Sequence, residues 1–314
     1  MMTRVRTAVA AVLAGAVLGV SGCDRNAPGT DGDLFDGWQP LAAPGAAEPG
    51  TAVPRAGMCL DSPTRTPFDP GFVQATPIEC ERGHALEVVL VGTVDGSAAQ
   101  ADEPPAAGSE AFQAAYAACS TAVSDYVGGD WHTGMLGIDV QVPNRDQWRE
   151  GRRAYVCTVF TSTNAMGVMS LTSASLKGSL AGNAPQAIRC LAVNGTKAAD
   201  GWWDRVYALA QIDCAKPHGA EFVGTVQLAA GGALPAEEVL EDWSVDRCNA
   251  LIAKYLGITA DRFEDRADIG VFWDVMDQNR WNSGDRHRRC FALFYPGKNV
   301  RASIKGLGTK ALPV

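Results

Sequence analysis

Two His-x-x-Glu pairs are the first residues in the sequence that could do chemistry: His84 with Glu87, and His218 with Glu221. On a helix such a pair would share one face and could bind a metal ion. Each pair stands instead at the entry to a strand-like stretch, where residues three apart point to opposite faces. We expect each histidine to form a structural hydrogen bond beside a disulfide. Contact with a partner is the alternative, and metal binding is the least favoured role.

A Trp-x-x-Gly-x-Arg motif also occurs twice, and its glycine suits a tight turn before a strand. The arginine can stack on the tryptophan ring as a cation–π pair. A packed hairpin corner is the preferred interpretation, and an exposed aromatic residue that docks a partner or a glycan is the alternative. The residues are Trp148 with Arg153 and Trp281 with Arg286.

Serine and lysine stand two residues apart near the end of each half of the chain, and on a strand they would share one face. Such a pair can act as a nucleophile and its base. No oxyanion element accompanies it, so a turn at a strand end is preferred. The sequence also lacks a P-loop and the G-x-G-x-x-G, G-x-S-x-G and H-E-x-x-H motifs, so we expect no enzyme activity and no cofactor. The pairs are Ser175 with Lys177 and Ser303 with Lys305.

Nine cysteines divide into Cys23 and eight others. Outside the cytoplasm an even set is most simply a set of disulfides, and the absence of a C-x-x-C pair disfavours zinc. If both halves of the chain close in the same way, three pairing patterns remain. The preferred pattern joins the first cysteine of each half to the second and the third to the fourth. It gives Cys59–Cys80, Cys119–Cys157, Cys190–Cys214 and Cys248–Cys290.

Strands and a helix within residues 85–180 are expected to position these residues in the first half of the chain. Residues 85–92 and 154–160 are rich in branched apolar residues and indicate strands. Between them, Ser109 suits the N-cap of a helix that runs to Val127, with Gly128 after its end. The third cysteine then lies on the apolar face of the helix and the fourth on a strand, so their disulfide would join helix to sheet.

Residues 188–308 repeat the landmarks of residues 56–180 in the same order. A helix is expected between Pro235 and Gly257, followed by a strand over residues 289–295. We interpret this as tandem duplication of one module, with a short join near residues 181–185 that brings the modules together. The expected fold class is α+β, with one main helix packed on a mostly antiparallel sheet in each disulfide-stapled module.

The N-terminus has the pattern of an export signal. Arg4 and Arg6 precede an apolar run over residues 8–20, which is shorter than the about 20 apolar residues that span a bilayer. The run ends in Val-Ser-Gly-Cys, which resembles the bacterial lipobox and predicts a signal peptide over residues 1–22. Cys23 would then be acylated, with palmitate for example, and the protein would be held at the outer face of the cell membrane. An ordinary cleaved signal is the alternative.

Residues 23–55 hold this cysteine and a tether rich in Gly, Pro, Ala and Asp. The net charge is −8, and removal of residues 1–22 would make it −10. Such acidity disfavours nucleic acid as a partner. Residues 261–268 lack the spacing of a calcium loop and suit a solvated face. Residues 286–289 form a local basic spot, which we expect at a salt-bridging edge.

Several of these landmarks together resemble the septum-formation-related domain, a family found mainly in actinobacterial membrane proteins and lipoproteins. They are the Cys-x-x-x-His-x-x-Glu element, the helical cysteine ahead of Tyr-x-Gly, the Trp-x-x-Gly-x-Arg-x-x-x-Cys element and the closing Ser-Leu-Lys-Gly. The resemblance covers both modules. It implies a link to septum formation and cell division, which is an association rather than a mechanism.

The sequence therefore predicts a non-catalytic cell-envelope lipoprotein whose paired modules bind another envelope protein. It would contact the membrane through its lipid anchor and would bind no metal, cofactor or nucleic acid. A protein that binds peptidoglycan or wall glycan, or hydrolyses it, is the alternative. The candidate partner-binding residues are His84, Glu87, Trp148, Arg153, His218, Glu221, Trp281 and Arg286.

Overall fold

The computed structural model describes residues 54–61, 76–228, 231–298 and 300–314. The predicted signal peptide, the lipidated Cys23 and nearly all of the predicted tether lie outside these residues. Among the described residues, no helix is both long and apolar enough to cross a membrane.

The first sheet is built from antiparallel strand pairs in the order β2-β1-β3-β5-β4, with β6 beside β5. Its central strand β5 is buried along nearly its whole length, which agrees with its run of branched and aromatic residues. The strands are β1 (Cys59–Asp61), β2 (Thr76–Ile78), β3 (Leu86–Thr93), β4 (Leu136–Gln141), β5 (Ala154–Ser162) and β6 (Met169–Ser170).

The second sheet is also antiparallel, in the order β10-β11-β9-β7-β8. Read from its other end, this order matches the main path of the first sheet, strand for strand. The α+β class, with a helix packed on each antiparallel sheet, is therefore confirmed. The strands are β7 (Cys190–Lys197), β8 (Trp203–Ile212), β9 (Ala220–Gln227), β10 (Ile269–Trp273) and β11 (His287–Phe294).

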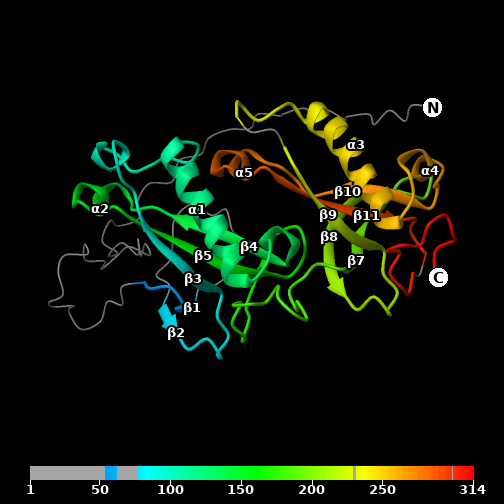
Figure 1. Ribbon diagram of the computed structural model, residues 1–314, viewed down its shortest axis with the longest axis horizontal. Coiled ribbons are helices and arrows are strands. Elements are labelled where there is room, and N and C mark those ends of the chain that lie inside the picture. The colour runs from blue at the N-terminus through cyan, green and yellow to red at the C-terminus, as the bar shows by residue number, and fades with distance from the viewer. Residues whose placement is uncertain (1–53, 62–75, 229–230, 299) are drawn as a thin grey trace, which may run out of the picture. The chain divides into compact units, whose positions relative to one another are not determined.

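One long helix lies along each sheet, α1 (Glu110–Val127) on the first and α3 (Glu237–Leu256) on the second (Figure 1). As predicted, the Ser109 hydroxyl caps α1 by accepting from the Phe112 amide, and Gly128 ends it in the left-handed conformation. The short helices are η1 (Ala98–Gln100), η2 (Trp131–Thr133), α2 (Arg145–Arg149), α4 (Ala260–Glu264) and α5 (Gln278–Ser283).

The disulfides join these layers in the pattern that the sequence favours. Cys119–Cys157 connects α1 to β5, and Cys248–Cys290 connects α3 to β11. Cys59–Cys80 and Cys190–Cys214 close the shorter loops at the starts of β1 and β7. All four preferred pairs are confirmed, and they indicate that the protein folds in an oxidising compartment outside the cytoplasm.

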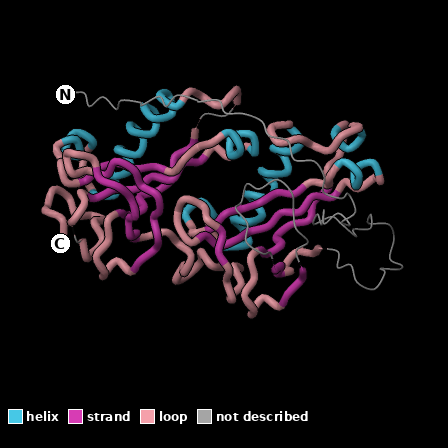
Figure 2. The backbone as a smooth tube through the Cα atoms, turned by 180° about the vertical axis from the view of Figure 1, so that it is seen from behind, coloured by secondary structure: helices cyan, strands magenta, loops and turns pink. Residues whose placement is uncertain are grey.

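A mixed apolar cluster connects the two modules. Met135 and Ala165 from the first module pack with Leu191, Leu209 and Phe291 of the second. Backbone hydrogen bonds reinforce this contact, for example from the Ala165 amide to the Leu209 carbonyl at 2.9 Å. The described residues of both modules accordingly belong to one compact unit. Figure 2 shows its strands and helices from the opposite side.

Removing the buried disulfide of one module should cost a predictable amount of stability. In the chain-entropy model, a loop of 38 residues contributes about 3–4 kcal/mol. We expect the paired change Cys119→Ala and Cys157→Ala to lower the free energy of unfolding by at least this amount, because both sulfurs are also fully buried. Denaturant titration measures it. A loss smaller than that of the matched Cys59→Ala and Cys80→Ala variant, whose loop is shorter, would contradict the expectation.

Candidate functional site

Glu87 is fully buried and lies at the centre of a hydrogen-bond network. Its carboxylate accepts from His84 Nε2 at 3.0 Å, the Tyr126 hydroxyl at 2.8 Å and the Leu176 amide at 2.7 Å. The Ser175 hydroxyl is a fourth donor, at 3.3 Å. Because these donors come from the strand entry, from α1 and from the turn at residues 175–178, the carboxylate ties the three together. The hydrogen bonds expected of His84 are confirmed. The expectation that His84 and Glu87 point to opposite faces is wrong, because His84 lies before the first residue of β3 and strand alternation does not apply to it.

Glu221 has the same set of partners in the second module. It accepts from His218 Nε2 at 3.1 Å, the Tyr255 hydroxyl at 2.9 Å, the Ser303 hydroxyl at 2.8 Å and the Ile304 amide at 2.9 Å. Both serines of the Ser-x-Lys pairs therefore donate to a buried carboxylate. The two lysines are exposed, so the structure does not assemble a Ser–Lys nucleophile at either turn.

Both ring nitrogens of His218 face acceptors, since Nδ1 lies 2.9 Å from the Lys216 carbonyl and Nε2 faces the Glu221 carboxylate. Burial acts to lower the pKa of His218, but these two hydrogen bonds outweigh it and raise the pKa. Burial, and then the charge of Glu221, raise the pKa of Tyr255 to about 12, so its hydroxyl remains a donor. The two acceptors that face the ring therefore favour its protonated form beside the buried carboxylate.

The Trp-x-x-Gly-x-Arg motifs form packed corners, as preferred. The guanidinium carbons of Arg153 and Arg286 lie 3.8 Å and 3.7 Å from the ring centroids of Trp148 and Trp281. Both indole rings are buried, so neither offers an exposed aromatic surface. Of the eight candidate partner-binding residues, all are buried except the half-buried Arg153. Their role in partner binding stays a prediction, and the structure places them inside the fold.

The expectation that residues 286–289 form an exposed salt-bridging edge is wrong. Arg288 is fully buried, and Arg286 and Arg289 are each 8% exposed. Arg288 and Arg289 are buried because they lie on β11, which lies between β10 and β9 and is buried along nearly its whole length. Arg286 precedes β11 and is buried against Trp281. Arg288 donates to the Ser244 hydroxyl at 2.7 Å within its own module.

Arg289 instead reaches into the first module. Its Nε donates to the His132 carbonyl at 2.7 Å, and its Nη2 donates to the carbonyls of Gly134 at 3.1 Å and Leu136 at 2.9 Å. Nη1 donates to the Ala165 carbonyl at 3.3 Å. One buried guanidinium thus donates hydrogen bonds to four backbone carbonyls of the other module and fixes η2 against β11.

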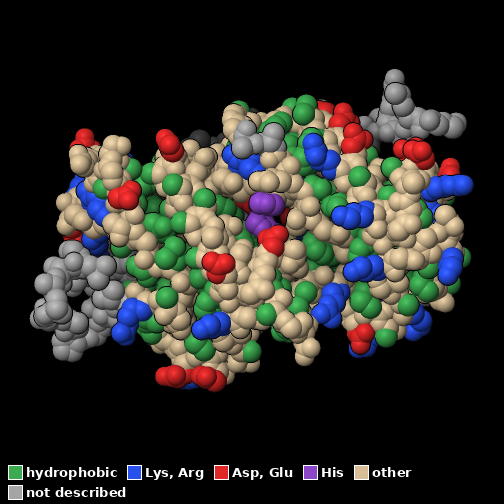
Figure 3. All heavy atoms as spheres, in the orientation of Figure 1, with side chains coloured by type: hydrophobic (Ala, Val, Ile, Leu, Met, Phe, Trp, Pro, Cys, Tyr) green, Lys and Arg blue, Asp and Glu red, His purple; other side chains and the backbone are tan. Residues whose placement is uncertain are grey.

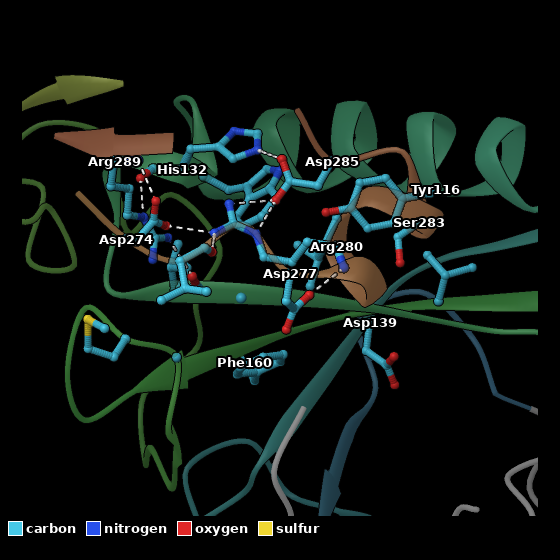
Figure 4. A pocket seen from close by; sticks show the side chains of 18 of the residues that line it. Tyr116, His132, Asp139, Phe160, Asp274, Asp277, Arg280, Ser283, Asp285 and Arg289 are labelled. Atoms are coloured by element: carbon cyan, nitrogen blue, oxygen red, sulfur yellow. Dashed lines mark hydrogen bonds and ion pairs between the residues drawn. The ribbon is translucent and has the colours of Figure 1, made fainter. Parts of the chain in front are cut away.

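A pocket of about 220 Å³ lies at this junction (Figure 4). Its wall from the first module is largely apolar, and its wall from the second is largely charged. The apolar side includes Phe112, Trp131, Ile138, Val140, Phe160 and Met166, and the polar side includes Asp274, Asp277, Arg280, Ser283 and Asp285.

Arg280 organises the charged wall by lying between two buried carboxylates (Figure 4). It contacts Asp274 Oδ2 at 2.9 Å and Asp285 Oδ2 at 2.8 Å. Burial alone would raise the pKa of Asp285, but the Arg280 guanidinium holds it well below its usual range. Four carboxylates line the pocket against two guanidinium groups, so the lining carries excess negative charge.

Tyr116 supplies a hydroxyl to the same pocket. Burial, followed by the charge of Asp285, raises the pKa of Tyr116 well above its usual value, so the hydroxyl stays protonated. Among the described residues it makes no hydrogen bond. The pocket therefore combines apolar walls, an acidic lining and one available hydroxyl group, which suits a ligand with apolar and basic groups.

The sequence does indicate these junction residues, because they stand at positions where the two modules differ in residue type. Asp285 and Arg289 align with Arg152 and Val156 of the first module when the glycines of the Trp-x-x-Gly-x-Arg motifs are superimposed. A buried arginine in place of valine marks a position where the second module has a contact that the first lacks.

Replacing Arg289 should uncouple the modules. We expect Arg289→Met to cost about 3 kcal/mol or more, because it removes charge-assisted hydrogen bonds and leaves buried carbonyls short of donors. Calorimetry should resolve two unfolding transitions. Arg288→Met is the matched control, because its bonds stay within the second module, and it should keep a single transition at a lower temperature. An Arg289→Met protein that melts like the wild type would contradict this account.

The imidazolium of His218 should give a defined pH dependence. The pKa of His218 in the folded state lies above its value of about 6.5 in the unfolded chain. The stability that this difference contributes is fully present below about pH 6.5 and is lost as the pH rises through the folded-state pKa. We therefore expect the free-energy difference between wild type and His218→Gln to be largest in acid and to shrink above about pH 6.5. Denaturant titrations across this range measure it. Tyr255→Phe, which removes no group titrating there, should show a difference independent of pH.

Comparison with known proteins agrees with the resemblance seen in the sequence. No curated protein and no solved structure shows significant similarity to the chain. A family model described as septum formation matches residues 56–290 in one continuous span. This span includes both buried carboxylates, the junction arginine and all eight disulfide cysteines, and it covers more than half of the chain. The chain therefore belongs to the septum formation family.

Proposed function

We propose that this protein is a non-catalytic binding protein of the cell envelope, which holds a segment of another envelope protein in the pocket between its two modules. The observation that carries the proposal is the junction pocket, with apolar residues on one wall and acidic residues on the other. It lies where the two modules depart from each other in sequence, so the duplicated parts would serve as a scaffold and the junction as the site.

Two features support the proposed location outside the cytoplasm. The four disulfides indicate an extracytoplasmic protein. Acylation of Cys23 after removal of residues 1–22 would add a lipid anchor at the outer face of the membrane. Membership of the septum formation family supports a place in division.

The occupant that fits the pocket best is a peptide segment with an apolar side chain beside a lysine or arginine. Phe112, Ile138 and Phe160 offer apolar contact, and the volume of about 220 Å³ suits a large side chain rather than a folded domain. Asp277 and the pair Asp274 and Asp285 favour a basic group and repel an acidic one. Wall polymers rich in phosphate or carboxylate would be disfavoured.

Site-specific photocrosslinking in growing cells tests this proposal. A photoreactive side chain at Val275, which lines the pocket and is 60% exposed, should capture one envelope protein. The matched control is Val239, which is 59% exposed on α3 and lies outside the pocket. A second change that fills the pocket, Met166→Arg, should abolish capture at Val275. The linked peptide should carry an apolar residue beside a basic one.

Other outcomes would overturn the proposal. Equal capture at Val275 and Val239, or capture that survives Met166→Arg, would place the partner elsewhere. Incubation of the full-length protein with purified peptidoglycan tests the alternative function. Retention of the protein on peptidoglycan that Met166→Arg abolishes would favour wall-glycan binding. Release of peptidoglycan fragments would favour a hydrolase.

A further inference from the structure

Three potential metal ligands converge beside the junction pocket. Nε2 of His132, Oδ1 of Asp285 and Nδ1 of His287 lie within 4.8 Å of one another. His132 comes from η2 in the first module, and the other two come from the start of β11 in the second. Figure 3 shows histidine side chains beside carboxylate side chains at the centre of this face, and within the cluster the His287 side chain is 32% exposed.

His132 presents a buried nitrogen that has no hydrogen-bond partner among the described residues. Its Nδ1 lies 2.6 Å from Asp130 Oδ1. When Nδ1 carries the proton of this hydrogen bond in the neutral ring, Nε2 presents a lone pair to an ion. Nε2 is shielded from solvent and makes no hydrogen bond among the described residues. A buried polar atom without a hydrogen bond is costly, so its presence calls for an explanation.

The distances around Asp285 fit coordination better than hydrogen bonding. Oδ1 lies 3.6 Å from His132 Nε2 and 3.5 Å from His287 Nδ1. Bonds of about 2.0–2.1 Å to a tetrahedral zinc ion place its ligand atoms about 3.4 Å from one another. Small movements of these side chains would bring all three atoms to one ion. The His132 and His287 rings already lie side by side, with their centroids 4.0 Å apart.

We propose that His132, Asp285 and His287 bind a divalent transition-metal ion of the zinc class, which bridges the two modules. Two imidazoles and one carboxylate are a common ligand set for such an ion and leave a fourth position open. His132 and Asp285 also line the pocket, so the ion would stand at its edge. The proposal goes beyond partner binding and does not depend on it.

Neighbouring side chains already orient the ligands as a metal site requires. Asp130 holds His132 through Nδ1, which is the usual carboxylate–histidine arrangement behind a metal ligand. Arg280 binds Oδ2 of Asp285 and leaves Oδ1 toward the histidines. The His287 backbone amide also donates to Oδ1, at 2.9 Å, which fixes the direction of the carboxylate.

Two other clusters of potential ligands lack these properties. Cys59 with His84 and Glu87, and Cys190 with His218 and Glu221, also bring suitable atoms together. Their cysteines are in disulfides, and both nitrogens of each histidine have hydrogen-bond partners. His218 therefore provides a matched histidine control.

Metal titration of the full-length, untagged protein tests the proposal after treatment with a chelator. We expect calorimetry to show one equivalent of Zn²⁺ bound, and Co²⁺ to give the intense visible absorption of a tetrahedral site. His287→Ala, which changes the most exposed ligand, should weaken binding at least about 100-fold, and Asp130→Asn about 10–100-fold. His218→Gln should bind Zn²⁺ as the wild type does. Near-ultraviolet circular dichroism checks that each variant is folded.

Three results would overturn the metal site. They are wild-type protein that takes up no stoichiometric Zn²⁺, binding that is unchanged in folded His287→Ala, and binding that is lost in folded His218→Gln.

Discussion

The buried guanidinium of Arg289 is the interaction on which the arrangement of this protein depends. A charge removed from water is costly unless it is hydrogen-bonded, and here four carbonyls of the first module supply the bonds. The second module therefore reaches its lowest free energy only when η2 and the start of β4 are in place. That requirement orients the pocket walls and brings His132 to Asp285.

The repeated residues and the unrepeated ones have different roles. Glu87 and Glu221 each tie a strand entry, a helix and a closing turn together, and the disulfides fix the same helices to the same sheets. These features stabilise each module from within. Arg289 and Asp285 have no counterpart in the first module and form the junction. The difference in residue type between the two modules is thus concentrated at the surface where they meet.

The sequence was informative where local rules decide the structure. The cap at Ser109, the left-handed Gly128 and the pairing within each module depend on neighbours or on the repeat, and all were predicted. The buried arginines were not, because a run of charged residues is typical of a surface. The hydrogen-bond partners of Arg289 lie more than 120 residues away in the chain, so only the tertiary structure reveals them. The repeat mismatch at Arg289 and Val156 was the available clue.

The junction should make the two modules one rigid body. Backbone nitrogen relaxation measured by NMR can test this, because it reports how fast each amide tumbles. We expect one common rotational correlation time for the strands of both sheets. Two distinct and shorter correlation times, one for each module, would show that the modules tumble independently and would contradict it.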